Sequence, residues 1–107
     1  MTSLLNLEIL QQRIIALENE KRVRACMQKY MRLCDDLGPG CELETLMQLF
    51  TEDAVWEGKG KRYATTFGRH VGIDAIEAMF AKYTQEPGHF FLNVHLLGNE
   101  VITVDGN

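Results

Sequence analysis

The first third of the chain places its hydrophobic residues at helical spacing. Gly and Pro are absent between Ser3 and Asp36, and apolar residues recur every three or four positions, which predicts one long helix. This repeat slips across the polar run 18–22, so the front half of the helix can present a different face from the rear half. The front half could pack on a neighbouring subunit or only on the protein's own sheet. Gly-Pro-Gly at 38–40 ends the helix.

Two shorter helices are predicted further along. The first runs from about Glu42 to Phe50, and its apolar residues lie on one side. The second begins near Gly72, continues to about Tyr83 with its apolar residues on one face, and is closed by Glu-Pro-Gly at 86–88. Each of these helices therefore has an apolar side and a polar side.

Short strands are predicted between these two helices. The segment 54–57 reads as a strand that Gly58 stops, and 67–71 adds a short extended piece. The stretch 59–66 is polar and lacks an apolar repeat, so we predict a loop there.

A long strand is predicted over about 89–104, kinked at Gly98, because this stretch is rich in β-branched and aromatic residues and contains no Pro. Alternation along a strand places His95 and Asn99 side by side on one face, while the other face is largely apolar. Asp-Gly-Asn at 105–107 is a hairpin signal, because type I′ turns need positive φ at both central positions. The partner strand does not follow in this sequence. The chain could be a fragment, a naturally short form, or a subunit whose sheet another subunit completes.

Composition and charge indicate one globular domain. The 107 residues are 46% hydrophobic and 24% charged, which is far from the disordered class. The net charge of -4 comes from acids spread along the chain, and basic residues gather only within 59–70, which argues against nucleic acid as a partner. No stretch approaches the roughly 18 apolar residues of a membrane span, and the start lacks the basic region of a signal peptide. We therefore expect a cytoplasmic protein without a membrane partner.

The three cysteines do not indicate a disulfide framework or a metal site. Cys26, Cys34 and Cys41 form an odd set without a Cys-x-x-Cys pair. The first two fit small core residues of the long helix better than nucleophiles, because no neighbouring residue marks a lowered thiol pKa.

Two acids at the end of the long helix break a local rule. Asp35 and Asp36 face the negative end of the helix macrodipole, which costs roughly 0.3–1 kcal/mol each if nothing compensates. Such violations occur at strained or functional positions, so at least one of the two is expected to have a buried partner. The alternative is a pair of solvated loop acids.

Tyr30 and His95 complete a candidate proton-transfer set with Asp35. Residues five apart point roughly 140° away from each other in mid-helix, but Tyr30 and Asp35 can converge at a terminating turn. A phenol, a carboxylate and an imidazole in one pocket could move protons at neutral pH. His95 alone would equally fit a satisfied core histidine.

Four segments along the chain carry a family resemblance. They are Tyr30-x-x-x-x-Asp35, Leu49–Glu57, Gly72–Ile76 and His95–Gly106. Together they resemble the SnoaL-like branch of the nuclear transport factor two-like superfamily. The likeness covers nearly all of the chain from about Val23, so we predict a SnoaL-like domain at 23–107 with a helical extension at 1–22, forming a single domain overall.

The resemblance implies an α+β fold shaped as a cone. N-terminal helices would pack against a curved, mostly antiparallel sheet, here without its last strands, around a hydrophobic pocket. It also implies a homo-oligomer, a dimer or a trimer, formed through the outer face of the sheet. The apolar face of the predicted strand would then be covered by a partner sheet.

The resemblance further implies a site. Dehydratases of this superfamily line the pocket with a Tyr and an Asp from the first helix and a His from the sheet, and Tyr30, Asp35 and His95 match these positions. His89 is the alternative histidine. The implied activity is that of a lyase or isomerase, of dehydratase or cyclase type, on a small hydrophobic cyclic molecule, without metal or cofactor. A non-catalytic ligand-binding or dimerisation module, or a truncated inactive member, is the alternative.

Further residues are candidates for binding the substrate. Asn99 would be a polar neighbour of His95. Aromatic side chains could form apolar walls, although ordinary core packing explains each of them as well. These aromatic candidates are Trp56, Phe67, Phe80 and Phe91.

Overall fold

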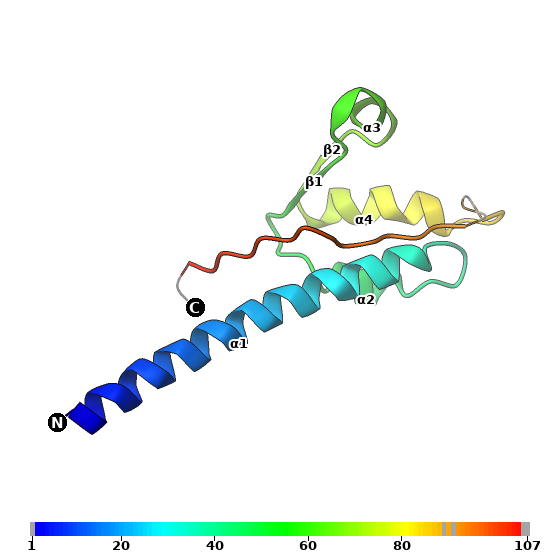
Figure 1. The fold of residues 1–107 in the computed structure, drawn as a ribbon. Coiled ribbons are helices and arrows are strands. Elements are labelled where there is room, and N and C mark those ends of the chain that lie inside the picture. The colour runs from blue at the N-terminus through cyan, green and yellow to red at the C-terminus, as the bar shows by residue number, and fades with distance from the viewer. Residues whose placement is uncertain (1, 89, 91, 106–107) are drawn as a thin grey trace. The chain divides into compact units, whose positions relative to one another are not determined.

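The computed structural model describes residues 2–88, 90 and 92–105, and the described chain is mainly helical with one small sheet (Figure 1). The elements in chain order are α1 (Thr2–Asp35), α2 (Leu43–Met47), β1 (Val55–Glu57), α3 (Gly60–Thr66), β2 (Arg69–Val71), α4 (Ile73–Ala81) and the 3₁₀ turn η1 (Lys82–Thr84). The α+β class with a truncated sheet is confirmed. The predicted long helix and the predicted helix after Gly72 are both present.

The chain forms two compact units. The first consists of Met1–Met31 and Leu96–Asn107, and the second consists of Arg32–His95. The division falls inside α1, between Met31 and Arg32.

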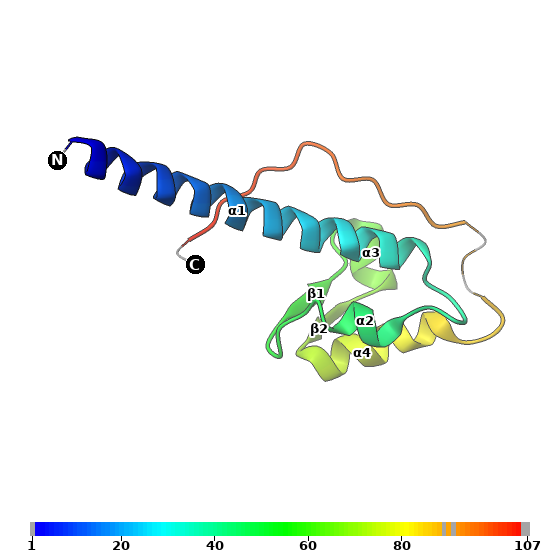
Figure 2. The same cartoon turned by 90° about the horizontal axis from the view of Figure 1, so that it is seen from below.

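The first unit pairs α1 up to Met31 with the C-terminal segment, whose described residues are 96–105. Residues of this segment line one shallow groove with Val23 and Met27 and a second groove with Ile15 and Asn19. The segment therefore runs along α1 in the opposite direction to the helix (Figures 1 and 2). An ion pair between Arg24 and Glu100 fastens it to the helix.

The stretch after η1 differs from the predicted long strand. Its described residues within 90–105 join no sheet, and Asn99, next to the predicted kink at Gly98, has a φ of 52°. A strand joins a sheet only where a neighbouring strand satisfies its backbone hydrogen-bonding groups, and among the described residues only β1 and β2 pair in that way. The turn residues 106–107 themselves lie outside the described part of the chain.

The second unit contains the sheet. β1 and β2 are antiparallel, with Val55 opposite Val71 and Trp56 opposite His70, which confirms the two short strands. The connection between them carries α3 at the end of the hairpin (Figures 1 and 2).

The prediction of a loop over 59–66 was therefore wrong for Gly60–Thr66. No residue of α3 is buried. A repeat of apolar residues reveals a helix only when one face of that helix is buried. Because α3 buries no face, its sequence carries no such repeat.

The core of the second unit lies between α2 and α4. Leu46 and Ile76 are fully buried, and Met79 and Phe80 lie beside them with at most 4% of their surface exposed. Gly72 allows α4 to begin directly after β2, because its φ of 88° is a conformation that favours glycine. Its N–H donates to the carbonyl of Ala54, and this bond joins the start of α4 to the start of β1.

Candidate functional site

The candidate site is built where α1 ends. Asp35 is the last residue of α1, and one of its carboxylate oxygens, Oδ1, accepts two hydrogen bonds from His95. The backbone N–H of His95 donates over 2.5 Å and the ring Nδ1 over 2.8 Å. One of the two helix-terminal acids, Asp35, therefore has a specific partner, but that partner is only half-buried and not buried as predicted, whereas Asp36 is exposed.

The contact with Asp35 determines which ring nitrogen of His95 carries the proton. An ionised carboxylate only accepts hydrogen bonds, so Nδ1 must be the donor in this pair. In the neutral imidazole, Nε2 then holds the lone pair. A histidine oriented in this way by a carboxylate can take a proton at Nε2, and the carboxylate stabilises the imidazolium that results.

Asn93 adds a third hydrogen bond at the same helix end. Its side-chain amide donates over 2.8 Å to the carbonyl of Cys34, one of the terminal carbonyls that lack a partner within a helix. Asn93 and His95 alternate along the extended segment, and both are half-buried, while Leu92 and Val94 are 79% and 61% exposed. The alternation that puts His95 and Asn99 on one face also puts Asn93 there, but the sequence gives no further sign that Asn93 belongs to the site.

The Asp35–His95 pair is accessible to solvent. The side chains of His95 and Asp35 are 37% and 31% exposed. Water therefore competes for both groups in this chain, and a bound substrate would have to displace it to strengthen the electrostatic interactions at the site.

The other predicted polar residues lie in the first unit. Tyr30 is half-buried on α1, and Asn99 is exposed. The structure thus brings Asp35 and His95 together within the second unit. Roles for Tyr30 and Asn99 beside them remain predictions. His89 and Phe91 lie outside the described residues.

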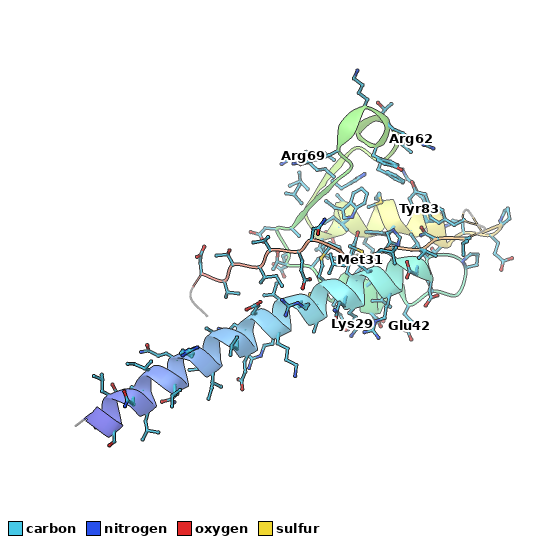
Figure 3. All side chains as sticks on the ribbon, in the orientation of Figure 1. Lys29, Met31, Glu42, Arg62, Arg69 and Tyr83 are labelled. Atoms are coloured by element: carbon cyan, nitrogen blue, oxygen red, sulfur yellow. The ribbon has the colours of Figure 1, made fainter. Side chains whose placement is uncertain are left out.

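The predicted aromatic residues form a cluster in the second unit. The Trp56 ring packs edge-on against Phe67 and Phe80, with centroid distances of 5.8 and 5.7 Å. Tyr83, labelled in Figure 3 just beyond α4, contacts Phe67 at 5.9 Å and stacks on Phe90 at 5.5 Å. Phe80 is only 3% exposed, so it already fills the core. Substrate contacts from the cluster remain a prediction.

The first unit contains an apolar groove of its own. It has a volume of about 520 Å³, within the range of roughly 300–1,000 Å³ that is usual for small-molecule sites. Glu100 is its single charged lining residue, and the rest are apolar or weakly polar. These remaining residues are Val23, Cys26, Met27, Leu97, Val101 and Ile102.

Two further properties concern metals and membranes. Within 2–88, 90 and 92–105, no three His, Cys, Asp or Glu residues come together in a way that could hold a metal ion. None of the helices in the part of the chain that the structure describes is long and apolar enough to cross a membrane.

Comparison with known protein families identifies the family to which the chain belongs. The model of the SnoaL-like domain family matches residues 16–107. The chain belongs to the SnoaL-like domain family. This family is part of the nuclear transport factor two-like superfamily and includes cyclases, dehydratases and other ligand-binding members. No match to the chain was found among curated proteins or among solved structures.

Proposed function

We propose that this SnoaL-like domain is a cofactor-independent acid–base enzyme, of dehydratase, isomerase or cyclase type, for a small hydrophobic cyclic substrate. The observation that carries the proposal is the pair of hydrogen bonds from His95 to one oxygen of Asp35. They fix both the backbone and the ring of His95, and they leave Nε2 as the basic atom.

In the proposed dehydration, Nε2 of His95 removes the proton next to a substrate carbonyl, and the electrons of the C–H bond pass into an enolate. The enolate expels the hydroxyl group on the β carbon, which takes the same proton back from Nε2 and leaves as water. Asp35 stabilises the imidazolium that exists between these two steps. Tyr30 is proposed to donate a hydrogen bond to the enolate oxygen.

The test uses the step that dehydration, isomerisation and cyclisation share. A panel of fused-ring β-hydroxy ketones is incubated with the protein in D₂O, and NMR follows deuterium exchange at the α carbon and formation of the enone. We expect exchange with wild type, a loss of about 10²–10⁴-fold in His95→Gln, and a smaller loss in Asp35→Asn. Asp36→Asn is the matched control and keeps the wild-type rate. Equal rates in wild type and His95→Gln, or no exchange with any panel member, would contradict the proposal.

A non-catalytic ligand-binding module is the second candidate, and the groove in the first unit favours it. Its lining is almost entirely apolar and contains neither Asp35 nor His95. A fluorescent apolar probe displaced equally well from wild type and His95→Gln, in a protein without exchange activity, would support this candidate. Displacement that requires His95 would support the enzyme.

The proposal includes the biological setting. We propose that residues 23–107 form the functional domain and 1–22 a helical extension, that the protein works in the cytoplasm, and that it oligomerises through its sheet. Support for oligomerisation comes from Leu92 and Val94, whose side chains are well exposed on the extended segment, although this segment lies outside the sheet of β1 and β2. A second copy could cover them.

A further inference from the structure

The front of α1 carries an apolar seam that is independent of the proposed active site. Leu7, Leu10, Ile14 and Leu17 follow one another at spacings of three, four and three residues, the pattern of positions a and d in a coiled-coil heptad. All four are exposed, between 52% and 65%. Most of the seam also precedes residue 16, so it lies outside the part of the chain that matches the family.

The C-terminal segment lies over other positions of the same helix. The grooves between α1 and this segment are lined from the helix by Ile15, Ala16, Asn19, Glu20, Val23, Cys26 and Met27. In the register that makes Leu7 an a position, these are mainly b, c and f positions, which lie on the side of a helix away from a and d. The segment therefore occupies one side of α1 and leaves the seam on the other.

Charged residues beside the seam fit a second copy of the same helix. Arg13 is a g position and Glu18 is the e position of the following heptad. In a parallel pair of helices, g of one chain faces the following e of the other. Arg13 of each copy would then meet Glu18 of the other, in two equivalent ion pairs. An antiparallel pair centred on the seam would instead bring the two Arg13 side chains together.

The same register explains where the pairing ends. Lys21 takes the next a position, and a single Lys at a is a feature that fixes register and oligomer state. Arg24 takes the next d position, but its guanidinium bonds Glu100 and Glu20 of its own chain. The hydrogen bond to Glu100, and after it the hydrogen bond to Glu20, raises the pKa of Arg24 above its ordinary value. Arg24 is therefore charged and already paired within its own chain, so the apolar seam ends before this position.

We infer that the front of α1, over residues 4–18, forms a parallel two-stranded coiled coil with the same segment of a second copy of this chain. Ile at a with Leu at d favours two strands. Ile14 at a with Leu10 and Leu17 at d fits that pattern, while the first a position is Leu7. This pairing is separate from any contact through the sheet and does not depend on catalysis.

The first experiment compares two variants of the full chain by sedimentation equilibrium over a range of concentrations. Leu10→Gln changes the seam, and Leu5→Gln makes the same change at an f position on the same helix, where the exposure of 57% is close to the 52% of Leu10. We expect Leu10→Gln to raise the dissociation constant at least about tenfold, while Leu5→Gln keeps the wild-type value. Circular dichroism checks that both variants stay helical.

The outcomes of this comparison are distinct. The molecular mass of wild type should approach 24.4 kDa, twice the 12.2 kDa of one chain. If the dimers also associate through the sheet, the mass should approach a multiple of 24.4 kDa. A wild-type protein that is monomeric at every concentration would overturn the inference. So would equal dissociation constants for Leu10→Gln and Leu5→Gln, since the contact would then lie elsewhere.

A charge swap tests the parallel direction. Arg13→Glu alone, or Glu18→Arg alone, places like charges opposite each other in a parallel pair and should weaken association about tenfold. The double variant exchanges the charges and should restore it. Arg13 and Glu18 are five apart on one helix, so they do not pair within a chain. Association of Arg13→Glu equal to that of wild type would indicate the antiparallel arrangement, in which two Glu side chains at position 13 only replace two Arg13 side chains, and would overturn the inference.

Discussion

Asp35 and His95 are sixty residues apart in the sequence, yet one carboxylate oxygen of Asp35 accepts both the backbone N–H and the ring N–H of His95. An acid at the C-terminus of a helix is unfavourable by itself. The two donors offset that cost and at the same time orient an imidazole. The contact that compensates the unfavourable acid at the end of α1 is therefore the same contact that orients His95 as a candidate base.

The contribution of this contact to stability can be measured by replacing Asp35. Asp35→Ala leaves the backbone N–H of His95 without its acceptor and should lower the free energy of unfolding by about 1–2 kcal/mol. Asp36→Ala is the matched control, because Asp36 is the exposed neighbour. It should leave stability unchanged or raise it slightly, since it removes an acid from the helix end. Equal losses in urea denaturation of the two variants would contradict the role given to Asp35.

Elements that bury one face could be predicted from the sequence. The helix over Ile73–Ala81 shows this, because Ile76, Met79 and Phe80 repeat at helical spacing and are all buried. Elements without such a face could not. Gly60–Thr66 is helical with no buried residue, and the stretch 92–105 has the composition of a strand but joins no sheet, because pairing depends on another strand and not on composition alone.

Ile76 provides a test of the core between α2 and α4. It is fully buried, so Ile76→Ala should cost about 2–5 kcal/mol and Ile76→Val about 0.5–1.5 kcal/mol. Ile9→Ala is the control, because Ile9 is 47% exposed and should change the free energy of unfolding by no more than about 0.5 kcal/mol. Chemical denaturation gives all three values. A small effect of Ile76→Ala would mean that the core is not packed as described.

Gly58 tests the close approach of α3 to the hairpin. A Cβ atom on Gly58 would lie 2.3 Å from the carbonyl oxygen of Tyr63, and a backbone atom cannot move aside cheaply. Gly58→Ala should therefore destabilise the protein by about 1–3 kcal/mol. Gly38→Ala is the matched control, since nothing lies within 4 Å of its added Cβ. A thermal midpoint for Gly58→Ala at or above that of Gly38→Ala would show that α3 does not sit against Gly58.

The candidate site could be predicted in part. The violation at Asp35 and the strand alternation at His95 single out both residues, but neither pattern says that they touch, because the contact depends on how the chain returns to the end of α1. Asn93 also donates a hydrogen bond to the Cys34 carbonyl. The only sequence pattern that pointed to Asn93 is the strand alternation that puts it on the same face as His95. Both Asp35–His95 and Asn93–Cys34 are long-range contacts that local periodicity does not encode.

The most direct test of the account is the tautomer of His95. A long-range proton–nitrogen NMR correlation spectrum of the protein distinguishes protonated Nδ1 from protonated Nε2 in the neutral ring. With Asp35 accepting the bond from Nδ1, we predict that the Nδ1–H form dominates in wild type and in Asp36→Asn, and that Asp35→Ala loses this preference. A wild-type spectrum dominated by Nε2–H would show that Asp35 does not hold the ring, and it would contradict His95 as the oriented base.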